Sequence, residues 1–254
     1  MARKRRKVGP IVGWILLVVL IFVTGYFVRF YLEIGRLARR NPSTTALIEM
    51  RRLERGDKGA RAPLPNHWHP LSQISPNLQH AVVVAEDARF YQHRGFDWNA
   101  ILEAAGRDWE AKSFEYGGST ITQQLAKNLY LSPDKNFFRK VKEALITSAL
   151  ETRLSKRRIL EVYLNVVEWG DQIYGAEAAS RDYFGKPAAA LTPEEAAFLA
   201  AILPAPRYYH RHRTTPYIRK RSEVILREMK RRYPESGPER ENGFEETSQS
   251  ERRS

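Results

Sequence analysis

The sequence predicts a mostly α-helical domain that follows a single N-terminal transmembrane helix. Three observations support this fold class. An apolar run without charged residues extends over residues 8–28, which as a helix is about the length needed to cross a hydrocarbon core of about 30 Å. Beyond residue 65, apolar side chains recur at the 3.6-residue period of amphipathic helices. Sustained alternation of apolar and polar residues, the pattern of half-buried β-strands, is hard to find.

The apolar run is preceded by residues 1–7, of which positions 3–7 are all Arg or Lys. A cleavable signal peptide is the alternative interpretation, but its apolar region is usually shorter, and no small-x-small cleavage site follows the run. Basic residues also follow the run, so the positive-inside bias is weak, although long domains translocate largely regardless of such charges. We predict an uncleaved anchor with its N-terminus in the cytoplasm. Residues 29–64 are predicted to form a charged, partly helical connector.

Helix start signals divide the domain predicted for residues 65–233. Ser75 precedes a proline, which is typical of an N-cap followed by the first helical position. Ser155 precedes apolar residues at helical spacing. Thr192, followed three residues later by Glu195, matches a capping box. These signals predict three helices that begin at those residues.

The composition limits the classes of partner and chemistry. The chain has 254 residues, a formal net charge of +13 and no cysteine. The excess of basic residues predicts an anionic partner, and nucleic acid, anionic lipid headgroups and a phosphorylated substrate all fit. The lack of cysteine excludes disulfides, thiolate metal sites and thiol nucleophiles. Residues 234–254 are polar with little to bury, so we predict a disordered tail.

The first candidate catalytic residue is Glu86, which ends an apolar helical stretch and opens a polar one. A carboxylate at such a junction can be half buried, which raises its pKa and suits a general base or acid. The alternative is a solvated pair formed with Asp87 at a helix end.

A second candidate segment begins with Gly117-Gly118-Ser119, a loop that enters a helix with Ser119 as its predicted N-cap. Free backbone N–H groups at such a terminus can bind an anion. The polar residues of the following helix suit hydrogen bonding to a sugar or phosphate. On one face or beside it lie Thr120, Gln123, Gln124, Lys127 and Asn128. The alternative is an ordinary solvated face.

A third segment places Arg139, Lys140 and Glu143 within one helical turn. Surface ion pairing is one interpretation, and it stabilises a helix by only about 0.5 kcal/mol. The other is a paired cation site for a pyrophosphate, with a carboxylate beside it. Such cations stabilise the negative charge that grows on a departing phosphate.

Together these segments resemble the motifs of the peptidoglycan glycosyltransferases. The pattern Glu-Asp-x-x-Phe-x-x-His-x-Gly occupies residues 86–95, and the run Gly-Gly-Ser-Thr-Ile-Thr-Gln-Gln-Leu-Ala-Lys-Asn occupies residues 117–128. The pattern Arg-Lys-x-x-Glu-Ala begins at residue 139, and two further segments, 163–176 and 191–204, resemble the remaining motifs in the family's order. The Lys-Thr-Gly motif of the penicillin-binding transpeptidase domain is missing. The chain is therefore most similar to the monofunctional members.

The resemblance implies a lysozyme-like helical fold that polymerises lipid II into β-1,4-linked glycan strands, with inversion and release of undecaprenyl pyrophosphate. Glu86 would be the general base for the 4-hydroxyl of the acceptor sugar. Arg139 and Lys140 would bind the donor pyrophosphate. Glu143 would position that site, assist the leaving group or help hold a divalent cation such as Mg or Mn. The donor cleft would be lined by Ser119, Thr120, Gln123, Gln124, Lys127 and Asn128.

The same resemblance implies a location and partners. We expect a single-pass protein of the bacterial inner (cytoplasmic) membrane, with its catalytic domain on the periplasmic side. The expected partners are lipid II, the growing glycan strand and membrane lipid, with cell-wall or division-complex proteins as further candidates. No nucleic-acid motif is recognised in the sequence, so nucleic acid is not expected. The alternatives are a lysozyme-like glycan-cleaving enzyme, which also uses two carboxylates, and a non-catalytic membrane-anchored cell-wall scaffold.

Overall fold

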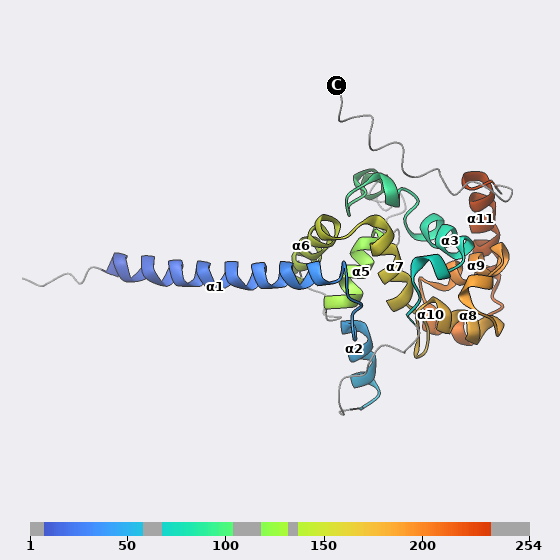
Figure 1. The fold of residues 1–254 in the computed structure, drawn as a ribbon, viewed down its shortest axis with the longest axis horizontal. Helices are drawn as coiled ribbons and strands as arrows, with labels where there is room; N and C mark the ends of the chain where they lie inside the picture. The colour runs from blue at the N-terminus through green and yellow to red at the C-terminus, as the bar shows by residue number, and fades with distance from the viewer. Residues whose placement is uncertain (1–7, 58–67, 104–117, 132–136, 235–254) are drawn as a thin grey trace, which may run out of the picture.

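The fold is a helical body from which one long helix, α1 (Val8–Arg36), projects (Figure 1). The computed structural model describes residues 8–57, 68–103, 118–131 and 137–234. The predicted tail therefore lies almost entirely outside the described residues. The predominance of helix over the described ranges confirms that the domain is mostly α-helical.

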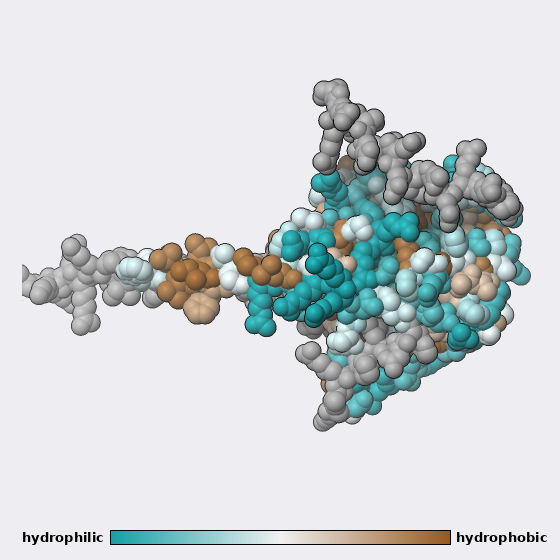
Figure 2. Space-filling model, viewed as in Figure 1, coloured by the Kyte–Doolittle hydropathy of each residue, from teal (hydrophilic) through white to brown (hydrophobic). Residues whose placement is uncertain are grey.

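Helix α1 begins with the apolar run and continues past residue 28 to Arg36 without a break. Figure 2 shows apolar side chains on the surface of the projecting part. Trp14 and Phe22 of α1 are both exposed. Over the part of the chain that the structure describes, none of the helices combines the length and apolar character that a membrane crossing needs. The membrane-spanning role of residues 8–28 therefore stays a prediction.

The C-terminal end of α1 is fixed to the body by its side chains. Ile34 is fully buried. The ring of Phe30 meets that of Tyr130 edge to face, with centroids 5.1 Å apart. The guanidinium of Arg153 lies 4.7 Å above the ring of Tyr31. These contacts give α1 a defined direction relative to the body.

The predicted connector contributes a helix of its own, α2 (Ala46–Glu54), which packs against the body. Thr45 caps its N-terminus by accepting a hydrogen bond from the backbone of Ile48. Arg51 forms an ion pair of 3.0 Å with the largely buried carboxylate of Glu168. The described part of the connector is thus docked through a specific ion pair.

The body is built from short helices that pack around one hydrophobic core. Their bounds are α3 (Pro76–Glu86), α5 (Ile121–Tyr130), α6 (Phe137–Arg153), α7 (Lys156–Val166), α8 (Ala176–Phe184), α9 (Pro193–Ile202), α10 (Pro206–Arg211) and α11 (Pro216–Arg232). Single turns of 3₁₀-helix are formed by Leu71–Gln73, Phe90–Gln92 and Ala188–Ala190. The apolar α9 packs against both α3 and α11, which also contact each other (Figure 1). Its burial explains why it carries apolar residues on nearly every side.

All three predicted helix starts are confirmed. The hydroxyl of Ser75 accepts from the backbone of Asn77 at the start of α3, and that of Ser155 accepts from Arg158 at the start of α7. Thr192 forms the expected capping box with Glu195 at the start of α9.

A two-stranded antiparallel hairpin was not predicted. Its strands, β1 (Glu168–Gly170) and β2 (Ile173–Tyr174), are joined by a turn in which Gln172 has a positive φ of 64°. Strands of three and two residues are too short to show a detectable alternation. The hairpin buries Trp169, whose carbonyl accepts a hydrogen bond of 2.9 Å from the hydroxyl of Tyr183.

Gly175, at the end of this hairpin, is expected to tolerate no side chain. Its φ is +85°, and an added Cβ would lie 2.8 Å from the carbonyl oxygen of Asn165. We expect Gly175→Ala to lower the free energy of unfolding by about 1–3 kcal/mol, and thermal denaturation would measure the loss. Gly56 is the matched control, because its φ is +77° but nothing lies within 4 Å. An equal effect of Gly56→Ala would mean that the backbone conformation alone, and not the contact with Asn165, sets the cost.

Candidate active site

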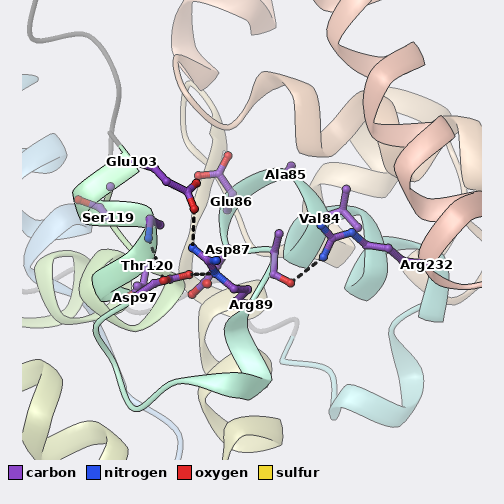
Figure 3. A pocket seen from close by; sticks show the side chains of 13 residues that line it. Val84, Ala85, Glu86, Asp87, Arg89, Asp97, Glu103, Ser119, Thr120 and Arg232 are labelled. Carbon is purple, nitrogen blue, oxygen red and sulfur yellow. Dashed lines mark hydrogen bonds and ion pairs between the residues drawn. The ribbon is translucent and has the colours of Figure 1, made fainter. Parts of the chain in front are cut away.

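Glu86 is the last residue of α3, and it opens onto a cavity of about 350 Å³. Figure 3 shows Glu86 beside Glu103 and Ser119 on one side of this cavity, with Arg232 on the other. The guanidinium of Arg232 donates a hydrogen bond of 2.9 Å to the carbonyl of Ala88 and so fastens the end of α11 to the rim. The predicted junction between an apolar helix and a polar loop therefore exists and forms a concave site.

One oxygen of Glu86 is held by a chain of two hydrogen bonds. The amide nitrogen of Gln124 donates to Glu86 Oε2 at 2.8 Å. The hydroxyl of Tyr163 donates to the amide oxygen of Gln124, also at 2.8 Å. Burial raises the pKa of Tyr163 well above its ordinary value, so this hydroxyl stays a donor. It thereby orients the amide of Gln124 with its NH₂ group toward Glu86.

The other oxygen, Glu86 Oε1, is buried and has no hydrogen-bond partner among the described residues. The nearest cation is Arg221 of α11, whose Nη2 lies 3.5 Å away. A carboxylate held at one oxygen and without a hydrogen bond at the other is arranged to accept a proton from an incoming hydroxyl.

Burial raises the pKa of Glu86 above that of a free glutamic acid, and neighbouring charges partly oppose that rise. The hydrogen bond from Gln124 lowers the pKa, as do the positive charges of Arg221 and Lys127, whereas the adjacent Asp87 raises it. The net result is a carboxylate more basic than usual, which is the property a general base requires near neutral pH.

The raised pKa of Glu86 predicts that Glu86→Gln stabilises the fold. A group whose folded-state pKa exceeds its unfolded value contributes stability below the unfolded pKa, and this contribution is lost as the pH rises through the folded pKa. At neutral pH the variant should therefore melt a few degrees higher than the parent, as expected for a change of about 1 kcal/mol. Below the unfolded pKa of about 4.3 the difference should shrink.

Thermal denaturation at neutral pH and at a pH below about 4.3 checks this prediction. Glu223→Gln, at an exposed position of α11, is the matched control and should leave the melting temperature unchanged at neutral pH. A melting temperature of Glu86→Gln equal to or below that of the parent would show that ionised Glu86 carries no net cost in the fold.

The N-cap of α5 is Thr120, so the prediction of Ser119 is wrong. The hydroxyl of Thr120 accepts from the backbone of Gln123, and the Gln123 side chain accepts from the backbone of Thr120 in return. Thr120 has the extended backbone that an N-cap requires. Its reciprocal partner three residues later was the sequence signal that distinguishes it from Ser119.

The predicted donor-cleft residues separate into two groups. Ser119 and Thr120 line the cavity at Glu86, and Gln124 and Lys127 interact with Glu86 directly or through their charge. Gln123 and Asn128 are buried, with Gln123 engaged in the capping box. Gln123 therefore supports the site through the start of α5.

Asp87 and His93 are site residues whose role sequence reasoning missed. Asp87 Oδ2 accepts a hydrogen bond of 3.0 Å from the backbone N–H of Ile121, and His93 Nε2 lies 2.8 Å from Asp87 Oδ1. This network ties the end of α3 to the start of α5. Both residues occur in the motif at residues 86–95, which was the signal that could have found them.

Asp87, His93 and Asp97 each offer a ligand atom within 4.8 Å of the others. The carboxylate oxygens of the two aspartates already have hydrogen-bond partners. Arg89 donates to Asp97 Oδ2 at 2.7 Å, and the backbone of Ala100 donates to Asp97 Oδ1 at 3.0 Å. We therefore interpret the cluster as a hydrogen-bond network that holds the loop after α3.

On α6, the predicted cation pair converges on a buried carboxylate. Arg139 Nη1 lies 3.1 Å from Glu143 Oε2, and Lys140 Nζ lies 2.5 Å from Glu143 Oε1. The Glu143 side chain is only 5% exposed, whereas that of Lys140 is 55% exposed. Glu143 thus holds the two cations at the surface, where an anion can reach them.

The predicted divalent cation would need free oxygens on Glu143. Both of its oxygens already bind a cationic side chain, so this donor set does not fit a divalent ion. We derive no step of the reaction through a metal, and the metal requirement stays a prediction.

Lys127 connects the two glutamates electrostatically. Burial lowers the pKa of its ammonium group, Glu143 and Glu86 raise it, and Arg139 and Lys140 lower it further. The ammonium group of Lys127 thus interacts with charges at the end of α3 and at the start of α6. The polar face of α5 therefore couples the carboxylate site and the cation site electrostatically.

The chain is similar to known proteins over most of its length. Residues 58–230 match the family model described as Transglycosylase. A biosynthetic peptidoglycan transglycosylase of Nitrosospira multiformis is 49% identical over 189 residues, which cover 74% of this chain and 82% of the relative. Proteins of the same name from Herminiimonas arsenicoxydans and Nitrosomonas eutropha are 44% and 45% identical, and the matches cover 85% and 86% of this chain and 94% and 91% of the relatives.

Proposed function

The chain belongs to the Transglycosylase family and is a peptidoglycan glycosyltransferase, and on this premise we propose that it polymerises lipid II into β-1,4-linked glycan strands. The observation that carries the proposal is that a buried carboxylate, Glu86, and a cation pair on α6 both interact with the charge of Lys127 on α5. A hydroxyl acceptor and a pyrophosphate donor need these two kinds of group on the same cleft.

In the proposed reaction, Glu86 takes the proton from the 4-hydroxyl of the acceptor sugar. The resulting oxygen nucleophile attacks the anomeric carbon of the donor from the side opposite to its pyrophosphate. The bond between that carbon and the pyrophosphate oxygen breaks, its electron pair leaves with undecaprenyl pyrophosphate, and the anomeric configuration inverts. Arg139 and Lys140 stabilise the negative charge that accumulates on the leaving group.

Of the three roles that the sequence left open for Glu143, the geometry supports positioning of the cations. Each of its oxygens binds one of the two cationic side chains. The burial of Glu143 restricts its movement, so Arg139 and Lys140 are preorganised for a phosphate group. Preorganised charges cost little reorganisation when the leaving group departs.

We further propose that α1 anchors the enzyme in the bacterial inner membrane, with residues 1–7 in the cytoplasm and the catalytic domain on the periplasmic side. The exposed apolar side chains along α1 and the basic residues before it support this proposal. The growing glycan strand and membrane lipid would then be its immediate partners, with cell-wall or division-complex proteins as further candidates.

A product assay tests the proposed function. The detergent-solubilised full chain is incubated with labelled lipid II, and the products are separated on a glycan-resolving gel. A ladder of lengthening polymer is the expected result. Shortening of preformed glycan without polymer formation would instead identify a glycan-cleaving enzyme, and the absence of both activities would favour a scaffold.

A further inference from the structure

Helix α11 brings one cation to the oxygen of Glu86 that has no hydrogen bond. Arg221 Nη2 lies 3.5 Å from Glu86 Oε1 and donates a hydrogen bond of 3.4 Å to the carbonyl of Ala85. The Arg221 side chain is 30% exposed and that of Glu86 is 12% exposed. The pair is therefore partly shielded from water, where charges interact more strongly than at a surface.

We propose that Arg221 is a positioning residue for Glu86, which keeps the carboxylate ionised and aims Oε1 at the acceptor hydroxyl. The proposal deepens the proposed function, because it rests on Glu86 acting as the general base. Arg221 acts through Glu86, and no contact between Arg221 and the reacting atoms is needed.

The two oxygens of the Glu86 carboxylate have different partners. Gln124 fixes Oε2 through a hydrogen bond of 2.8 Å. At 3.5 Å, the contact of Arg221 with Oε1 is longer than a good N–H···O bond. This contact supplies positive charge while leaving a lone pair of Oε1 available for a proton.

Other charged or titratable groups also face Glu86, but none combines the same features. Lys127 of α5 attracts Glu86 and is also attracted by Glu143. Asp87 and Glu103, which both line the cavity at Glu86, carry negative charges and cannot favour an ionised carboxylate. Tyr163 of α7 is linked to Glu86 through Gln124. Among the described residues, Arg221 is the cation that forms an ion pair with Glu86.

The fold holds Arg221 in place through the core face of α11. Ile218 and Ile225 are buried, at three residues before and four residues after Arg221, so all three share one side of the helix. Helix α11 packs against both α3 and α9. The side chain of Arg221 is therefore directed at the end of α3 by the same packing that forms the domain.

The test compares the pH dependence of polymerisation in the parent and in three variants. Arg221→Ala should move the acid limb of the profile of kcat/KM to higher pH by about one unit, because loss of a nearby opposite charge typically raises a carboxyl pKa by about 1–3 units. Arg221→Lys should restore most of the parent profile. Lys220→Ala, which removes the same charge from an exposed neighbouring position, should leave the profile unchanged.

A second readout does not require turnover. The difference in melting temperature between Glu86→Gln and the parent grows as the pH rises above the unfolded pKa, and the pH at which it stops growing reports the pKa of Glu86 in the fold. Arg221→Ala should move that levelling-off to higher pH, even if the parent makes no polymer and the proposed function fails. Arg221→Gln, which keeps more of the side chain, replaces Arg221→Ala if the latter does not fold.

Two results would overturn the proposal. One is a loss of activity by the same factor at every pH with the acid limb unmoved, which would indicate a purely structural role. The other is that the pH at which the difference in melting temperature between Glu86→Gln and the parent levels off is unaffected by either substitution of Arg221, which would show that this residue has no influence on the ionisation of Glu86.

Discussion

Replacing Glu86 by Gln is expected to reduce the rate of glycan polymerisation by about 10²–10⁴-fold, the usual contribution of a general base. The amide has nearly the same shape as the carboxylate and can still bond to Gln124, but it cannot take the proton of the acceptor hydroxyl. The loss should therefore appear in kcat, with the KM for lipid II nearly unchanged. Single-turnover measurement of the first glycosidic bond formed from labelled lipid II would separate the chemical step from product release.

The expected stability of this variant makes the result interpretable. Glu86→Gln should melt above the parent at neutral pH because the buried charge is removed, so a loss of activity cannot be attributed to unfolding. Glu223→Gln on the exposed side of α11 serves as the matched control for the chemistry of the substitution. Retention of more than a small fraction of the parent rate by Glu86→Gln would remove Glu86 from the role of base.

The helix starts could be predicted because their determinants lie within a few residues of one another. Ser75, Ser155 and Thr192 each satisfy backbone N–H groups two or three residues ahead, and apolar spacing then marks the helix that follows. The same local signals led to the wrong N-cap for α5, because Ser119 and the adjacent Thr120 are both residue types that favour the N-cap position. The reciprocal bond with Gln123 decides in favour of Thr120.

Contacts between distant segments could not be predicted in the same way. The ion pair between Glu86 and Arg221 joins residues 135 positions apart, and Arg221 stands among many other basic residues of α11. The bond from the backbone of Ile121 to Asp87 likewise depends on how α3 and α5 meet. Neither contact leaves a periodic signal, because each is set by packing of the whole domain.

The sequence predicted which residues belong to the site better than it predicted how they are arranged in space. The helical spacing of Arg139, Lys140 and Glu143 implied their contact, and the structure contains both ion pairs. The spacing within α5 placed Gln124 and Lys127 on a common face, but it could not show that the charge of Lys127 interacts with both glutamates. That interaction depends on how α5 packs against α6.

Neutralising Arg139 and Lys140 together is expected to lower kcat/KM for lipid II by about 10²–10⁴-fold, since each charge-assisted hydrogen bond contributes about 1.5–3 kcal/mol. Substitution of both by Gln removes the two charges and leaves polar side chains with hydrogen-bond donors at both positions. Both kcat and KM should change, because the cations bind the ground-state pyrophosphate and stabilise the charge that develops on it. Inorganic pyrophosphate should compete with lipid II in the parent and lose that effect in the double variant.

Lys142 provides the control, because it is an exposed cation on the same helix that lies in a groove between α1 and α6. Lys142→Gln should leave both kinetic constants and the pyrophosphate competition unchanged. The buried Glu143 loses both charged partners in the double variant, which is expected to destabilise the fold, so the melting temperature must be measured alongside the kinetics. A double variant that keeps its fold and still responds to pyrophosphate as the parent does would place the donor phosphate elsewhere, with Lys127, whose charge interacts with both glutamates, as the next cation to replace.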